Sequence, residues 1–302
     1  MVRFRIGKVT ATLIEEMVDH SFELLKFFPL STQEELAENL DWLARGHYDP
    51  QTGRVLLSMH SWLLDTGKHK ILIDGCVGNG KNRPGRPDWC NLDTPFLDRL
   101  AAAGATPDDI DYVLCTHLHA DHIGWNTRMI GGRWVPTFPR AKYVFSRREH
   151  EFWEARLAAD AYAPGPHLIA YQDSVLPVVE AGQAMIVDDH AELADCLTLE
   201  PAPGHTPGHV AIWLKSNDER AVLTGDILHS PIQVKYPAWS CFGCIDPVQS
   251  AATRKQVLES TCEHRALLLP GHFMPPHAAY VDDAAGGFAL RFAESSDATH
   301  DR

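Results

Sequence analysis

The chain has 302 residues, of which 45% are hydrophobic and 22% charged, with 21 Gly and 20 Pro. These proportions are typical of a globular protein and exclude a collagen-like fibre, a coiled coil and a largely disordered chain. Because 40 acidic residues outnumber 27 basic ones and give a net charge of −13 at pH 7, we expect neither nucleic acid nor an anionic membrane surface as a partner.

In chain order, apolar runs closed by turn residues predict strands, and capped amphipathic stretches predict helices. The predicted elements are a strand at 8–15, a helix at 31–46, strands at 61–67 and 70–75, a helix at 94–104, strands at 111–116 and 141–146, a helix at 146–158, strands at 209–216 and 221–226, a helix at 246–262 and a strand at 266–272. This alternation favours an α/β fold with helices packed outside two sheets.

Two segments interrupt this pattern, at residues 17–60 and 76–93. The first contains the apolar stretch 22–30, which is compatible with core packing, a lid over a site or a subunit contact. The second is a long loop rich in Gly, Pro, Asn and Asp, and long loops in compact proteins often contribute to binding sites.

The chain has neither a transmembrane segment nor a signal-peptide core by its hydrophobic pattern, so we expect a cytoplasmic protein. Its seven cysteines cannot all pair, and we expect reduced thiols. The close pair Cys241 and Cys244 has no second C-x-x-C to complete a four-cysteine zinc site. We therefore interpret this pair as structural or incidental.

The most informative stretch is T-H-L-H-A-D-H, which directly follows the strand predicted at 111–116. In an extended chain His117 and His119 point to the same side, and a turn after them can bring Asp121 and His122 close. Imidazole and carboxylate are favoured ligands of Zn²⁺ and related ions. Four such side chains within six residues therefore indicate a site for one or two metal ions.

Further ligand candidates stand at the ends of other predicted strands, each directly after a glycine. They are His205 in PAPGHTPGH, Asp226 in LTGDILH and His272 in LLPGHF. Glycine allows the backbone to approach closely at such points. The neighbouring His209 begins the next strand, and we interpret it as structural.

The order THLHADH, GHTPGH, TGD and PGH resembles the metallo-β-lactamase superfamily of binuclear metal hydrolases. The resemblance implies an αβ/βα sandwich of two mixed sheets with helices outside and the metals at one edge. It also implies one hydrolase domain over 1–302, with the segment at about 17–60 as an N-terminal addition.

The resemblance assigns roles to the candidate ligands. By position, His117, His119 and His205 would hold the first divalent ion, Asp121, His122 and His272 the second, and Asp226 would bridge the two. Asp74, in ILIDG, matches an aspartate that supports the site without ligating. We expect zinc, although such ligands also accept Mn, Fe or Co.

Within the superfamily the chain resembles the quorum-quenching lactonases and, in GWN at 124–126 and in its N-terminal addition, the methyl parathion hydrolase and aryl-lactone hydrolase branch. His119 stands where the oxygen-reducing di-iron branch has Glu. His229 occupies the position of a tyrosine that contacts the substrate in the lactonases. By analogy, the N-terminal addition could also form a homodimer contact.

The resemblance predicts hydrolysis of a lactone or carboxylic ester by a hydroxide that bridges the two metals. Asp121 and His229 are the candidates for proton transfer to the leaving alkoxide. The predicted substrate pocket consists of Trp125, Phe273, Phe27, Phe28 and Trp239. The alternatives are a phosphotriester (organophosphate) hydrolase, a glyoxalase II-like thioesterase and a metal-binding module without activity.

Overall fold

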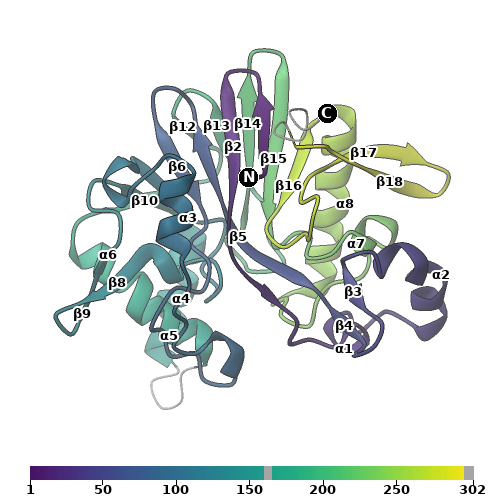
Figure 1. The fold of residues 1–302 in the computed structure, drawn as a ribbon, viewed down its shortest axis with the longest axis horizontal. Helices are drawn as coiled ribbons and strands as arrows, with labels where there is room; N and C mark the ends of the chain where they lie inside the picture. The colour runs from purple at the N-terminus through teal and green to yellow at the C-terminus, as the bar shows by residue number, and fades with distance from the viewer. Residues whose placement is uncertain (160–164, 296–302) are drawn as a thin grey trace.

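The computed structural model describes residues 1–159 and 165–295, and two seven-stranded sheets pack face to face at its centre (Figure 1). The first sheet has the strand order β1 (Arg3–Ile6), β2 (Val9–Asp19), β5 (Leu57–Asp65), β6 (Lys70–Ile73), β7 (Tyr112–Leu114), β10 (Lys142–Ser146) and β11 (Ala184–Val187). The second has the order β12 (Ala191–Leu193), β13 (Leu197–Pro201), β14 (Val210–Ser216), β15 (Glu219–Gly225), β16 (Leu267–Pro270), β17 (Ala279–Ala284) and β18 (Gly287–Phe292).

Both sheets are mixed, and their parallel pairs determine where the strand ends meet. In the first sheet β6, β7, β10 and β11 run parallel, while β1, β2, β5 and β6 pair antiparallel. In the second sheet β15 and β16 are parallel. Parallel neighbours bring their carboxyl ends to the same edge of a sheet.

Successive side chains of β16 point to opposite faces of the second sheet and contribute to two different hydrophobic clusters. Leu267 and Leu269 of β16 face the core between the sheets, whereas Leu268 between them packs in a second apolar cluster. That second cluster includes Leu258 of the long helix α8 (Pro247–Glu263). Strands buried on both faces read as continuous apolar runs, which is why ALLLPGH lacks an alternating pattern.

Helices cover the outer faces of both sheets, with α3, α4, α5 and α6 on one side and α7 and α8 on the other (Figure 1). Their bounds are α1 Leu24–Phe27, α2 Gln33–Leu43, α3 Phe96–Ala102, α4 Arg147–Ala159, α5 Pro166–Ser174, α6 Leu176–Glu180 and α7 Ile232–Lys235. Short 3₁₀ turns lie at Pro87–Trp89, Pro107–Asp109 and Gly124–Asn126, and two small hairpins pair β3 (Tyr48–Asp49) with β4 (Arg54–Val55) and β8 (Thr127–Ile130) with β9 (Arg133–Pro136). No helix in the described part of the chain is long and apolar enough to cross a bilayer.

The eight strands and four helices predicted from the sequence are all present, with ends shifted by a few residues. Thr32 caps α2 in a capping box with Glu35, and the Asp246 side chain accepts hydrogen bonds from the backbone N–H groups of Val248 and Gln249 at the start of α8. The predicted α/β sandwich is confirmed. Several short elements had no clear sequence signal, among them the hairpin β17–β18 and the helices α5 and α6.

Candidate metal centre

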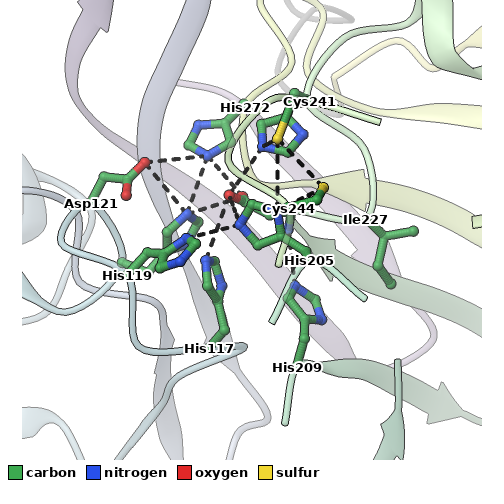
Figure 2. A network of polar contacts seen from close by, with 12 residues as sticks. His117, His119, Asp121, His205, His209, Ile227, Cys241, Cys244 and His272 are labelled. Atoms are coloured by element: carbon green, nitrogen blue, oxygen red, sulfur yellow. Dashed lines mark hydrogen bonds and ion pairs between the residues drawn. The ribbon is translucent and has the colours of Figure 1, made fainter. Parts of the chain in front are cut away.

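The candidate ligands converge at one edge of the two sheets because they follow the ends of neighbouring strands. Asp74 follows β6 and His117 follows β7, which run parallel. Asp226 follows β15 and His272 follows β16, which are parallel in the other sheet. The turn before β14 adds His205. Figure 2 shows three of these side chains, His117, His205 and His272, pointing toward one another.

One oxygen of Asp226 faces a first group of imidazoles. Its Oδ2 lies 3.0 Å from Nε2 of His205 and 3.6 Å from Nε2 of His117. His119 joins this group through its Nδ1, which is 2.9 Å from Nε2 of His205. The potential ligand atoms of His117, His119, His205 and Asp226 all lie within 4.8 Å of one another.

The other oxygen of Asp226 faces a second group. Its Oδ1 lies 3.0 Å from Nε2 of His122 and 2.9 Å from Nε2 of His272. Asp121 completes this group, with its Oδ2 at 3.7 Å from both imidazole nitrogens. Asp226 is therefore the residue common to both groups.

Glycines let the backbone place two of these residues. Gly225, directly before Asp226, has φ +46°, and a Cβ there would lie 2.5 Å from Oγ1 of Thr116. Gly204, directly before His205, has φ +129°, and a Cβ there would lie 2.2 Å from the backbone nitrogen of Ser250. Any side chain at either position would push a ligand away from the centre.

The donor set fits divalent cations. Ligand atoms about 2.0–2.2 Å from a tetrahedral Zn²⁺ lie roughly 3.4 Å apart, and the printed contacts between donor atoms in the two groups range from 2.9 to 3.7 Å. Nε2 of His117 is buried and has no hydrogen-bond partner among the described residues. Burial opposes protonation of His205, but Asp226 raises its pKa to about 10. The buried carboxylate of Asp226 therefore favours a positive charge among these imidazoles. A divalent metal ion bound by the deprotonated ligands would provide that charge.

Residues outside the two groups hold the ligands in place. Asp74 accepts from Nδ1 of His122 at 2.9 Å through Oδ2 and from the backbone N–H of Thr116 at 2.8 Å through Oδ1. Nε2 of His209 accepts from the backbone N–H of Asp226 at 3.1 Å. Such contacts typically orient metal ligands without touching the metal, and the supporting role of Asp74 and the structural role of His209 stay predictions.

Buried Glu149 links the two histidine motifs, and no pattern in the sequence singled it out. Its carboxylate accepts from the backbone N–H of Leu118 at 3.1 Å and of Gly208 at 3.0 Å, and from Nε1 of Trp153 at 2.7 Å. Leu118 lies between His117 and His119, and Gly208 lies in the loop that contains His205, so this one side chain connects the two loops.

The cysteine pair lies against the outer face of His205. Sγ of Cys244 is 3.4 Å and Sγ of Cys241 is 3.8 Å from Nδ1 of His205, and the two sulfurs are 3.6 Å apart (Figure 2). Hydrogen bonding from Cys241 lowers the pKa of the Cys244 thiol. The pair is thus in direct contact with a candidate ligand, which its spacing alone did not indicate.

A cavity opens over the centre, and its wall is mainly apolar. It is lined by Phe22, Phe27, Leu57, Met59, Arg86, Trp89, His119, Asp121, His167, His205, Asp226, His229, Cys241, Phe242, Gly243 and His272. His229 reaches the centre, with Nε2 at 3.1 Å from Oδ2 of Asp226, and its ring meets that of Phe27 edge to face at 5.3 Å between centroids. Burial lowers the pKa of His229, although Asp226 opposes this.

The structure places one of the five predicted pocket aromatics, Phe27, in the cavity wall and the other four in the packed interior. Trp125 donates its indole N–H to buried Glu16 at 2.7 Å and stacks on Phe96, and it does not line the cavity. Phe28 packs on Trp239, and Trp239 stacks on Tyr236. Phe273 lies in the cluster beneath α8. Proximity in sequence to a metal ligand did not determine the direction of these side chains.

Other cavity residues had no distinguishing sequence pattern. His167 of α5 stacks on His119 at 4.0 Å between ring centroids, and its Nδ1 accepts from the backbone N–H of Ala120. Arg86 and Trp89 come from the loop 76–93, and Phe22 and Phe27 from the segment 17–60. Both interruptions of the strand and helix pattern therefore contribute to the cavity wall.

The family model described as the metallo-beta-lactamase superfamily matches residues 55–280 of the chain. The N-acyl homoserine lactonase AiiA of Bacillus thuringiensis subsp. kurstaki is 24% identical in an alignment of 230 positions that covers 72% of this chain and 82% of that protein. The N-acyl homoserine lactonase AttM of Rhizobium radiobacter is 26% identical in an alignment of 222 positions that covers 68% of this chain and 78% of that protein.

Solved structures show the same fold. A hydrolase of the beta-lactamase superfamily, AbOPH, superposes with a TM-score of 0.81 at 22% identity over 98% of each chain. The dizinc quorum-quenching lactonase AidC superposes with a TM-score of 0.74 at 22% identity over 97% of each chain. These relatives are hydrolases, and the enzyme class expected from the sequence is confirmed together with the family. Since the family model covers more than half of its length, the chain belongs to the metallo-beta-lactamase superfamily.

Proposed function

We propose that the protein is a metal-dependent hydrolase of carboxylic esters and lactones. The observation that carries this proposal is the Asp226 carboxylate, whose two oxygens face two separate groups of imidazoles at the base of a cavity with an aromatic wall. The lactonase relatives support the same bond type. We also propose that residues 1–302 act as one hydrolase domain, to which the segment 17–60 contributes part of the cavity wall.

In this proposal the two groups hold two divalent ions. His117, His119 and His205 would hold the first ion, Asp121, His122 and His272 would hold the second, and Asp226, which faces both groups, would be shared between them. The nitrogen-rich donor set favours zinc. Two such ions would ionise a water near neutral pH and polarise the substrate carbonyl.

The chain's own residues would then handle the protons. Asp121 lies 3.7 Å from the imidazole nitrogens of His122 and His272, is half-buried and lines the cavity. It is thus placed to carry a proton to the leaving alkoxide. His229 lines the cavity, lies with Nε2 at 3.1 Å from Oδ2 of Asp226, and is the second candidate for this transfer.

The proposal is tested by measuring metal content and activity on the same purified protein. Elemental analysis for Zn, Mn, Fe and Co is followed by rates on dihydrocoumarin, an aryl ester, a thioester and the phosphotriester paraoxon. We expect two equivalents of metal per chain and the highest kcat/KM on the lactone or the aryl ester. A higher kcat/KM on paraoxon or the thioester would reassign the reaction, and two bound ions without any hydrolysis would indicate a metal-binding module.

Replacing His229 with Ala tests its part in proton transfer. We expect kcat on dihydrocoumarin to fall about 100-fold, within the range for general acid–base catalysis, while the metal content stays unchanged. His190→Ala removes an exposed imidazole and serves as the control. An unchanged kcat would show that His229 is a bystander, and a parallel loss of metal would make it a ligand.

Replacing Cys244 with Ala tests whether its sulfur supports His205. The imidazole N–H at Nδ1 would lose its nearest acceptor, 3.4 Å away, and the ring would be less well oriented toward Asp226. Loss of such a supporting contact typically lowers metal affinity by about 10- to 100-fold, which a chelator competition would measure. Cys262→Ala, a partly buried cysteine of α8, should leave the affinity unchanged. Equal affinity in both variants would show that the sulfur contact does not matter.

A further inference from the structure

The cavity wall contains one strong positive charge away from the metal ligands. Among the described residues that line it, Arg86 is the only Arg or Lys, and the carboxylates Asp121 and Asp226 both belong to the metal centre. Arg86 is half-buried. The remaining wall around it is aromatic and aliphatic, so its charge dominates that part of the cavity.

Three aromatic rings surround the guanidinium of Arg86. Its Cζ lies 4.6 Å from the ring centroid of Phe22, 5.4 Å from that of Trp89 and 5.6 Å from that of Phe242. These are distances at which a ring attracts a cation. Stacking of this kind uses the flat faces of a guanidinium and leaves its N–H groups free to donate.

Arg86 forms no ion pair with any carboxylate in the described part of the chain. Within residues 1–159 and 165–295, Arg86 has no side-chain hydrogen bond and no ion pair. The chain has 40 acidic residues against 27 basic ones, and nearby Arg83 is paired with Asp173 at 2.7 Å. An arginine that lines a cavity without a partner, in a chain with so many carboxylates, has free donors for a group that the protein itself does not supply.

The loop fixes the position of Arg86. Three residues before it, Arg83 is fully buried and paired with Asp173 of α5. Three residues after it, Trp89 donates its indole N–H to Oδ2 of Asp19 at 3.0 Å. The backbone N–H of Arg86 also donates to the carbonyl of Arg83 at 2.9 Å. Because the loop is held on both sides of Arg86, binding a ligand there costs less conformational entropy.

We propose that Arg86, set among Phe22, Trp89 and Phe242, is an anion subsite, and that the preferred substrate is an ester or lactone that carries a carboxylate away from the bond that is cleaved. This inference rests on the hydrolase function proposed above and adds the substrate class. The planar guanidinium can bind a carboxylate through two parallel hydrogen bonds. The apolar rings would contact the chain that joins this carboxylate to the ester.

Two esters of equal acyl length separate the anion subsite from the reaction itself. They are 4-nitrophenyl hexanoate, which is neutral, and mono(4-nitrophenyl) adipate, which ends in a carboxylate. We expect the metal-loaded protein to favour the adipate in kcat/KM, mainly through KM. In Arg86→Gln this preference should fall by about 10- to 100-fold, because a hydrogen bond to a charged group contributes about 1.5–3 kcal/mol.

Two further variants make the result specific. Arg86→Lys keeps the charge but loses the paired donors, so we expect an intermediate preference for the adipate. Arg45→Gln removes an exposed arginine outside the cavity and should leave the preference unchanged. Arg45→Gln should also cleave the hexanoate at the rate of the unmodified protein. For the two Arg86 variants the readout is the ratio of kcat/KM for the adipate to that for the hexanoate, because any change common to both esters cancels in this ratio.

The outcomes distinguish the two proposals. If both esters are cleaved and Arg86→Gln leaves their ratio unchanged, the anion subsite is overturned while the hydrolase function stands. If the unmodified protein prefers the hexanoate, the carboxylate-bearing substrate class is likewise overturned. If the protein binds two ions and cleaves neither ester nor dihydrocoumarin, the hydrolase function fails and the substrate class with it.

Discussion

Asp226→Asn is expected to abolish hydrolysis of esters and lactones and to lower the metal content below two ions per chain. The side chain contacts both imidazole groups, one through each oxygen, and an amide offers one neutral oxygen in place of two charged ones. Loss of a residue that only supports a ligand typically lowers activity by up to about 100-fold. We expect kcat/KM of Asp226→Asn to fall by more than this. Elemental analysis and rates on dihydrocoumarin would measure the two effects.

Asp74→Asn is the matched comparison, because Asp74 is also a buried carboxylate at this centre but touches His122 through the nitrogen that faces away from Asp226. Its loss should cost about 10- to 100-fold in metal affinity or activity, and excess metal should restore much of the rate. Full activity and two ions per chain in Asp226→Asn would remove the bridging assignment. Equal losses in the two variants would show that Asp226 is no more important than a supporting residue.

The candidate ligands could be found from sequence because their signals are local. The spacing of His117, His119, Asp121 and His122 places four donors in one short loop. The glycines before Asp226 and His272 indicate close backbone approach at strand ends. Parallel pairing then brings these ends to one edge, so a local pattern was enough to predict a site formed across two sheets.

The substrate cavity could not be predicted in the same way, because the direction of an aromatic side chain depends on distant partners. Trp125 lies next to the ligand motif, yet its indole N–H needs an acceptor, and buried Glu16 of β2 provides it. Phe273 follows His272 but points into the cluster beneath α8. Arg86 and His167 come from a loop and a short helix without periodicity, and only the packing of the whole chain reveals that they share a cavity.

Secondary structure, too, could be predicted where its signal is local, and could not be predicted where it depends on distant residues. Helix α8 was predictable because Asp246 and Pro247 provide a local start signal. The hairpin β17–β18 contains consecutive acidic residues and a Gly-Gly turn, and its alternation is weak because much of it is exposed. Its pairing with β16, which the sequence does not reveal, places it in the sheet.

Asp173→Asn is expected to produce the largest loss of stability outside the metal centre. The Asp173 carboxylate faces two fully buried cations, with Arg83 Nη1 at 2.7 Å and Lys81 Nζ at 3.3 Å. Breaking a buried ion pair by removing one partner costs about 3–5 kcal/mol, since the remaining charge stays desolvated. The loss of free energy of unfolding would be measured by chemical denaturation, and a lower melting temperature should accompany it.

The effect of Asp173→Asn should also depend on pH. Burial lowers the pKa of Lys81 to about 7, although Asp173 opposes this shift, and without the carboxylate that pKa should fall further. At pH 6 Lys81 is mainly charged in the folded unmodified protein. In the variant, placing this charge in the folded protein costs more free energy because Asp173 no longer stabilises it. At pH 9 Lys81 is mainly neutral in both folded proteins. The destabilisation should therefore be larger at pH 6 than at pH 9.

Asp188→Asn provides the control, because Asp188 is also paired with an arginine, Arg147, but lies exposed to solvent. Exposed pairs contribute little to stability, so its melting temperature should stay close to that of the unmodified protein. Equal melting temperatures for the two variants would show that the buried pair does not stabilise the loop 76–93.

If the buried pair does stabilise this loop, Asp173→Asn should also weaken the preference for the adipate ester at temperatures where the variant is folded. Arg86 would then lose its fixed position in the cavity wall.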